Sequence, residues 1–343
     1  MRSRFLLLCL AFSPVATLAH SGAAPEPAPP PPPPKFTLEK LTDKVYCLFG
    51  QGGNVGILVT DRGVLVVDDQ YENIAPGIVD QIRTVTDKPI RYLVNTHFHA
   101  DHTGGNPVFI KFAEIIAHDN VRPRLLDYPV AVARTFPDKI KNLEKDISAI
   151  ADSNDAYRVT LQKDLGLAKF FLDDATKFRI ESAAPPGITY EGHVKVWLGG
   201  EEVHIFHVAP GHTDGDSMVY FAGQKVLHMG DLFFHGTYPF IDAAGGGSAR
   251  GCIENIDYAI ANVPPDVKVI AGHGPVAGIA ELKRARDFLS DLWSEVDKAV
   301  KAGMSKADAI RAIRMEAYPE IKPAFMSLGN DISVIYDEIK AAR

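Results

Sequence analysis

The stretch VNTHFHADHTGG, residues 94–105, places three histidines and an aspartate within six positions. They are His97, His99, Asp101 and His102, and they directly follow an apolar run. A solvated loop rarely needs so many imidazoles, and a packed core rarely tolerates so many polar side chains together. In an extended or turning segment, residues two apart point the same way. His97 and His99 can therefore face one ion, while Asp101 and His102 can face a second.

Three later segments carry a similar polar residue next to glycine, where an apolar run ends. They are VAPGHTDGDS with His212, VLHMGDLFF with Asp231, and VIAGHGP with His273. Each residue alone is more typical of an ordinary surface or core position than of a ligand. Four such sites, each beside glycines that allow sharp turns, are a much less common coincidence. The sequence therefore predicts one site assembled from distant strand ends.

The composition is that of a globular protein with a sizeable core. The chain has 343 residues, 46% of them hydrophobic and 23% charged, and its formal net charge is −7. An acidic chain suits a nucleic-acid-binding surface poorly. We therefore expect a small-molecule substrate and no nucleic acid as partner, while the sequence leaves the oligomeric state undetermined.

Residues 1–19, MRSRFLLLCLAFSPVATLA, carry two arginines, an apolar run and then small residues. This pattern predicts a signal peptide cleaved after Ala19, and hence a periplasmic or secreted protein. The run is too short for a comfortable membrane span, so we expect no stable membrane insertion. Cys9 would suit a lipoprotein, but Leu8 stands where a small residue is usual. Residues 20–35 form a proline-rich linker that favours an extended tether.

Strand-like and helix-like segments alternate in two halves from residue 36 onwards, with the polar clusters at strand ends. This order fits an α/β sandwich of two sheets with outer helices, in one catalytic domain over residues 36–343. We expect strands within 44–50, 54–60, 63–69, 90–96, 114–118, 193–200, 201–208, 216–223, 224–231 and 267–274, and helices within 73–87, 104–112 and 252–263.

Residues 120–185 are more helical and polar, which predicts an insertion that forms a wall or lid. The C-terminal part, 280–343, has apolar residues three or four apart, the pattern of helices packed on a domain. The apolar positions are Leu282, Ala285, Leu289, Leu292, Val296 and Ala299, followed by Phe325, Leu328, Ile332, Ile335 and Ile339. Export would permit a disulfide between Cys47 and Cys252. Cys47 lies in an apolar strand-like run, which favours a buried free thiol.

The motif HxHxDH at 97–102, with GHT, GD and GHG further on, resembles the metallo-β-lactamase fold superfamily over most of residues 36–280. The resemblance implies an αββα sandwich of two mixed β-sheets, flanked by helices, with metals at one edge. His97, His99 and His212 would hold the first metal. Asp101, His102 and His273 would hold the second, and Asp231 would bridge both. Nitrogen and oxygen donors without thiolate suit two zinc ions, and also iron or manganese.

A metal-dependent hydrolase follows from this ligand set. Two metals that share a water lower its pKa to about 7, so that hydroxide is available to attack a carbonyl carbon. Asp101 would be both a ligand and the group that orients the hydroxide. No GxSxG nucleophile motif is present in the sequence.

Residues around the ligands have weaker assignments. Asp68, at the end of a strand, would support a histidine ligand, with a simple turn residue as the alternative. His235, Tyr238 and Phe240 could face the substrate. Thr96, Thr213 and Asp216 could brace the loops. His118, His193, His204, His207 and His228 are interpreted as structural.

The sequence does not determine the substrate class. Asp231 stands where zinc β-lactamases usually have cysteine or serine, and it resembles glyoxalase II and lactonases. Export favours β-lactam opening and a role in antibiotic resistance, while Asp231 favours ester, lactone or thioester hydrolysis. A mononuclear iron oxidoreductase acting on persulfides would use a subset of the same ligands. Nuclease and flavin-linked members usually carry added domains, and no segment here indicates one.

Overall fold

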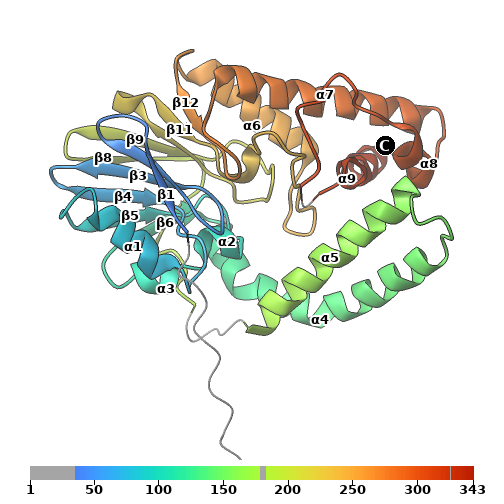
Figure 1. Ribbon diagram of the computed structural model, residues 1–343, viewed down its shortest axis with the longest axis horizontal. Coiled ribbons are helices and arrows are strands. Elements are labelled where there is room, and N and C mark those ends of the chain that lie inside the picture. The colour runs from blue at the N-terminus through green and yellow to red at the C-terminus, as the bar shows by residue number, and fades with distance from the viewer. Residues whose placement is uncertain (1–34, 178–182, 325) are drawn as a thin grey trace, which may run out of the picture. The chain divides into compact units, whose positions relative to one another are not determined.

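The computed structural model describes residues 35–177, 183–324 and 326–343. The signal peptide, with Cys9, nearly all of the linker, and Phe325 lie outside the described residues. Figure 1 shows the two sheets packed face to face, with helices on their outer sides. No helix among the described residues is long and apolar enough to cross a membrane.

The first sheet has seven strands in chain order, and it is mixed because only the later strands pair in parallel. Its strands are β1 (Thr37–Lys40), β2 (Val45–Phe49), β3 (Val55–Thr60), β4 (Gly63–Val67), β5 (Ile90–Val94), β6 (Glu114–His118) and β7 (Ile188–Tyr190). The second sheet has the order β13-β12-β11-β10-β9-β8, and within it β11 and β12 are parallel. Its strands are β8 (His193–Leu198), β9 (Glu201–Phe206), β10 (Met218–Phe221), β11 (Val226–His228), β12 (Lys268–Ile270) and β13 (Ala277–Gly278).

The alternation of side chains along β4 explains why both faces of the first sheet are buried. Leu65 and Val67 belong to the core between the sheets, together with Val219 and Ile270 of the second sheet. Residues at alternate positions on a strand point to opposite faces. Val64 therefore turns outward, into the core beneath α1 (Ala75–Arg83).

The outer face of the second sheet is covered by α6 (Ala249–Asn262) and α7 (Ile279–Lys301), and α9 (Leu328–Ala341) packs against these two helices. The apolar stripes expected for 280–343 are buried here, for example at Leu292 and Ile335. The short helix α8 (Lys306–Ala312) lies between α7 and α9 in the chain. The expected αββα sandwich is confirmed.

The two cysteines of the described chain are free and buried. Cys47 lies in the core between the sheets, whereas Cys252 belongs to α6 and lies in the core on the other face of the second sheet. Because a sheet separates them, the disulfide that export would permit does not form. The favoured interpretation of buried free thiols is confirmed.

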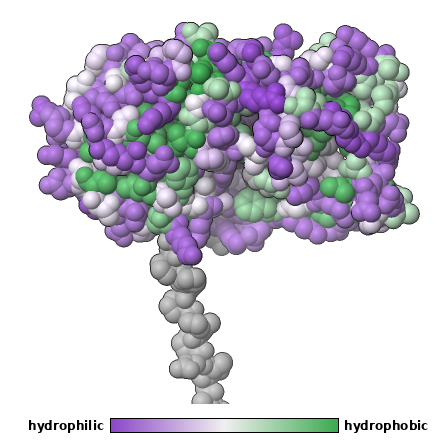
Figure 2. All heavy atoms as spheres, turned by 45° about the horizontal axis from the view of Figure 1, so that its top comes forward, coloured by the Kyte–Doolittle hydropathy of each residue, from purple (hydrophilic) through white to green (hydrophobic). Residues whose placement is uncertain are grey.

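The chain between β6 and β7 forms a helical hairpin of α4 (Val121–Ser148) and α5 (Ala156–Lys177). The two helices pack through their own apolar cluster, which includes Phe136 and Ala168. Figure 1 shows the hairpin projecting beyond the sheets, with the start of α5 below α8. In Figure 2 hydrophilic residues cover most of the visible face and surround separate apolar patches.

Parallel pairing sets the position of the polar strand ends. β4 and β5 run in parallel, so the segments after Val67 and Val94 leave the first sheet at the same edge. β11 and β12 do the same in the second sheet, after His228 and Ile270. The helix expected within 104–112 is shorter than predicted, because within this range only α3 (Asn106–Phe109) is α-helical. A separate short helix, α2 (Ala100–Thr103), precedes it.

Candidate metal centre

Seven histidine and aspartate side chains gather where the segments after β5, β9, β11 and β12 meet. They form two groups, and within each group the potential ligand atoms lie within 4.8 Å of one another. The first group is His97, His99, His212 and Asp231, and the second is Asp101, His102 and His273. All seven side chains singled out in the sequence are thus brought together.

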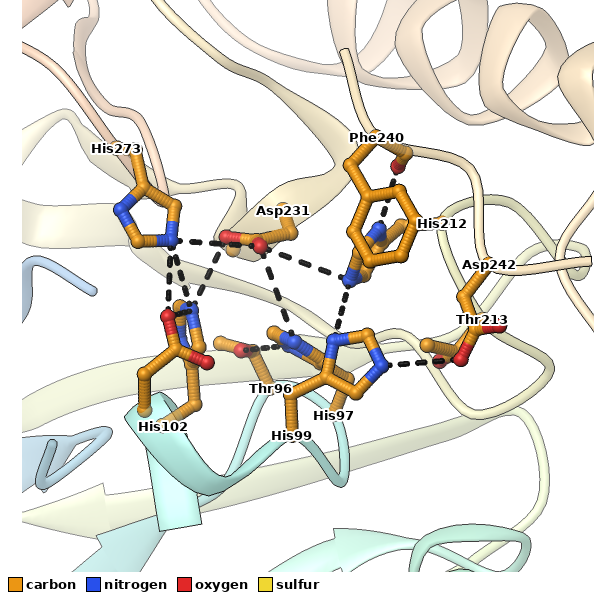
Figure 3. A network of polar contacts seen from close by, with 12 residues as sticks. Thr96, His97, His99, His102, His212, Thr213, Asp231, Phe240, Asp242 and His273 are labelled. Carbon is orange, nitrogen blue, oxygen red and sulfur yellow. Dashed lines mark hydrogen bonds and ion pairs between the residues drawn. The ribbon is translucent and has the colours of Figure 1, made fainter. Parts of the chain in front are cut away.

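The first group consists of three imidazoles beside the carboxylate of Asp231. His212 Nε2 lies 2.9 Å from His99 Nδ1 and 3.5 Å from Asp231 Oδ2. His97 Nε2 lies 3.9 Å from the same oxygen. Figure 3 shows His97 and His99 on one side, pointing toward Asp231 and His212 on the other. All four residues are at most 6% exposed, so this group is shielded from water.

The second group is more open. His273 Nε2 lies 3.2 Å from Asp101 Oδ2 and 3.4 Å from His102 Nε2. The side chains of His273 and Asp101 are 26% and 23% exposed, whereas that of His102 is fully buried. The open side of the centre is therefore the side of the second group.

Asp231 contacts both groups with one carboxylate. Its Oδ1 lies 3.2 Å from His102 Nε2, and its Oδ2 lies 3.5 Å from both His212 Nε2 and His273 Nε2. Asp231 sits in a 3₁₀ turn, Gly230–Leu232, directly after β11. This is the position that a bridging carboxylate requires.

Asp68 orients two of the imidazoles through the ring nitrogens that point away from the centre. It contacts His102 directly and His97 through the Thr96 hydroxyl. Its Oδ2 accepts hydrogen bonds from His102 Nδ1 and from the Thr96 hydroxyl, each at 2.8 Å. Because that hydroxyl donates to Asp68, it accepts from His97 Nδ1 at 3.0 Å. The Nε2 atoms of His102 and His97 are thereby directed at the centre. Asp68 has a φ of 63°, an uncommon conformation for a residue other than glycine, which fits a functional site.

Asp242 holds a third imidazole, and no pattern in the sequence predicted this role. His99 Nε2 donates to Asp242 Oδ2 at 3.0 Å, which turns His99 Nδ1 toward the centre. His212 Nδ1 donates to the carbonyl oxygen of Phe240 at 2.6 Å, which leaves His212 Nε2 for the centre. Outer carboxylates and carbonyls that fix imidazoles in this way are typical of metal sites. In the sequence, the only signal for this role of Asp242 is its position shortly after Asp231.

We expect Asp242→Asn to weaken metal binding by about 10-fold to 100-fold, because an amide cannot supply the negative charge beside His99. Competition with a chelator of known affinity would measure the change. Asp173→Asn is the matched control, since Asp173 is an exposed carboxylate on α5 paired with Lys177. Equal affinity in Asp242→Asn and the parent protein would remove Asp242 from the site.

The protonation states of the metal-free protein suit a cation. His97 Nε2 is buried without a hydrogen-bond partner. Burial holds the pKa of His97 well below its usual range and lowers the pKa of His212 to about 4, so both rings are neutral. Burial would raise the pKa of Asp101, but His102 and His273 outweigh it and bring that pKa down to about 2. Neutral imidazoles and ionised carboxylates are the forms that bind metal.

The second group is held together by charge when no cation is bound. Burial would lower the pKa of His273, but Asp231 and Asp101 outweigh it and raise that pKa to about 9. The pKa of His102 is also raised well above its usual range: burial opposes the shift, and Asp231 and Asp101 prevail. A cation entering this group replaces those protons.

The glycine-flanked loops are braced as the sequence suggested. Asp216 accepts hydrogen bonds from the Thr213 hydroxyl at 2.7 Å and from the Thr213 and Gly211 amides, which fixes the turn around His212. The side-chain amide of Asn54 donates to the carbonyls of Ala271 and Gly274 on both sides of His273. The Asn54 brace was not foreseen, since no spacing relates it to that loop.

The three residues expected near substrate have different surroundings. The Phe240 ring stacks on His99 with centroids 5.8 Å apart, next to the centre. His235 Nδ1 donates to the Pro275 carbonyl at 3.0 Å, and Tyr238 packs on Phe288. Substrate contact by these residues stays a prediction. The histidines expected to be structural are paired elsewhere, with His118 on His207, His193 on His204, and His228 bonded to the Asn54 carbonyl.

Comparison with known proteins places this site in a family. Residues 48–273 match the model of the metallo-beta-lactamase superfamily. A curated relative, the beta-lactamase-like protein 2 homolog of Caenorhabditis elegans, is 23% identical over 86% of this chain and 87% of its own length. Among solved structures, a sec-alkylsulfatase from Pseudomonas sp. superposes with a TM-score of 0.62 at 16% identity. It covers 88% of this chain, which spans only 50% of that protein. A metallo-beta-lactamase from Pontibacter korlensis gives a TM-score of 0.52 at 16% identity, over 75% of this chain and all of its own.

The chain belongs to the metallo-beta-lactamase superfamily. With its cluster of histidine and aspartate donors, it is a metal-dependent hydrolase of that superfamily. The structural likenesses establish the fold alone, so the substrate has to be argued from the residues around the centre.

Proposed function

We propose that the protein is an exported hydrolase that holds two divalent metal ions, with zinc as the preferred metal, and cleaves a carbonyl substrate. The observation that carries this proposal is the carboxylate of Asp231, which lies within 3.5 Å of His102, His212 and His273. One shared carboxylate between two donor groups supports a pair of ions rather than a single one.

Each part of the centre has a role in such a reaction. When bound, two divalent ions would acidify a water and polarise the carbonyl oxygen of the substrate. Asp231 fixes the separation of the two donor groups. Asp101, on the open side, accepts a hydrogen bond from the attacking water and so orients its lone pair toward the carbonyl carbon. The buried first group keeps bulk water from competing.

A carboxylate beside the centre, that of Asp174, favours an uncharged group on the substrate. We call the edge of the site formed by Asp174 and Tyr71 the rim. Asp174 follows Phe171 by three residues on α5, and the Phe171 ring lies 5.6 Å from that of His99, so Asp174 belongs to the helix face next to the centre. Burial raises the pKa of Asp174, and Asp101 is among the charges that raise it further. Burial also raises the pKa of Tyr71, with added contributions from Asp101 and Asp174. A carboxylate at the rim repels an anionic group such as a sulfate ester. An ester, a lactone, a thioester or a β-lactam suits this rim better.

A substrate panel tests the proposal. Zinc-loaded mature protein would be assayed with a penicillin, a γ-lactone, a thioester, an alkyl sulfate and a phosphodiester. We expect turnover of at least one carbonyl substrate, and the panel separates β-lactam opening from ester, lactone or thioester hydrolysis.

Two outcomes would count against this assignment. Turnover of the alkyl sulfate or the phosphodiester alone would contradict the carbonyl substrate. One iron per chain, with oxidation of a persulfide, would replace the hydrolase with the mononuclear alternative.

A further inference from the structure

Phe171 reaches the first donor group although it belongs to the helical hairpin. Its ring centroid lies 5.6 Å from that of His99 and 6.2 Å from that of Phe240. The Phe240 ring is nearly parallel to His99, with planes 14° apart. Three rings from three separate segments therefore form one aromatic surface beside the centre.

Tyr128 connects this surface to α4, the other helix of the hairpin. Its ring packs on Phe171 at 6.3 Å, and its hydroxyl lies 3.4 Å from the Asp242 carboxylate that holds His99. The residues Tyr128, Phe171 and Phe240 are each only partly buried. The aromatic surface thus keeps apolar area partly accessible beside the shielded first donor group.

We propose that Phe171 and Phe240 bind an apolar, preferably aromatic, group next to the scissile carbonyl, so that the α4–α5 hairpin sets substrate specificity. This proposal rests on the proposed function. A substrate that enters from the open second group and places its carbonyl at the centre would direct the substituent beyond the carbonyl toward the first donor group, where the aromatic surface begins. Contact between an apolar group and these rings removes apolar area from water and allows favourable ring geometry.

The spacing of residues on α5 also restricts the charge of the substrate's apolar substituent. Asp174 follows Phe171 by three residues, and residues three apart share one face of a helix. The apolar group therefore lies beside a carboxylate, which favours an uncharged or cationic substituent. The predicted substrate is a carbonyl compound with an aromatic side group that carries no negative charge.

Binding of two product analogues tests the proposal without turnover. Titration calorimetry would compare phenylacetate with acetate on the zinc-loaded protein. We expect the parent protein to bind phenylacetate more tightly than acetate. Phe171→Ala should weaken phenylacetate binding roughly tenfold and leave acetate binding unchanged within about twofold.

Two further variants separate ligand contact from a structural role. Val130→Ala removes an apolar side chain of the same hairpin that is 60% exposed, and it should leave both affinities unchanged. Phe171→Leu keeps an apolar side chain and should restore most of the phenylacetate preference.

Specific outcomes would overturn the proposal. A parent protein that binds phenylacetate no more tightly than acetate would do so. Equal weakening of both ligands in Phe171→Ala would also overturn it, because that result indicates a structural effect. The failure of all carbonyl substrates in the panel is a different result: it overturns the proposed function, while the ratio of the two affinities is still measurable.

Discussion

The double variant His97→Ala/His212→Ala is expected to lose its bound metal and its hydrolytic activity together. Both side chains are completely buried and direct Nε2 at the first donor group, so their removal takes two of its three imidazoles away. Metal-ion stabilisation of developing charge is worth several kcal/mol, so we expect kcat/KM to fall on the order of 10³-fold or more. Metal analysis of the dialysed protein and steady-state kinetics on the best panel substrate measure both effects.

The matched control for this variant is His204→Ala. His204 lies on β9, is partly exposed, and pairs with Glu202 rather than with the centre. It should retain metal and activity. Full activity in a metal-free His97→Ala/His212→Ala protein would show that the reaction does not use this centre.

Gly272→Ala is expected to have the second largest effect, although it removes no ligand. A Cβ atom at this position would lie 1.9 Å from Asp231 Oδ1 and 2.7 Å from the backbone of Gly230, so the Asp231 carboxylate has to move. A displacement of about 1 Å in a catalytic site can cost about 100-fold in rate, and we expect at least that loss in kcat/KM. Kinetics and metal content would be measured together, with circular dichroism to confirm that the chain is folded.

Gly166→Ala is the control for the glycine variant. No atom lies within 4 Å of a Cβ at Gly166, which is on α5, and alanine favours a helix there by about 1 kcal/mol. We expect unchanged activity and slightly higher stability. If Gly272→Ala is folded and fully active, the position of Asp231 does not matter in the way proposed.

The sequence indicated much of the fold because β4, β5, β11 and β12 are short apolar runs that end in glycine, histidine or aspartate. A run of this kind predicts that the strand is buried and also predicts the residue at which it ends. It did not indicate β1 or β7, which are short and largely exposed edge strands with weak patterns. Nor did it indicate β13, whose two residues carry no periodicity.

The candidate ligands could be predicted for a similar reason, because four of them stand close together in the sequence. These are His97, His99, Asp101 and His102, within six residues. The residues that surround the candidate ligands were harder to predict from the sequence. Asp242 bonds to a histidine 143 positions away, and no local pattern encodes that contact. Phe171 belongs to a helical stripe in which an aromatic residue is most simply explained by packing. Only the folded chain places its ring beside His99.

The most direct test of the central claim is the metal content of the parent protein, measured by mass spectrometry after saturation with zinc and removal of free metal. Two donor groups that share Asp231 predict two metal ions per chain, with both lost in His97→Ala/His212→Ala. A folded parent protein that binds no metal, or only one ion at saturating zinc, would contradict the dinuclear centre.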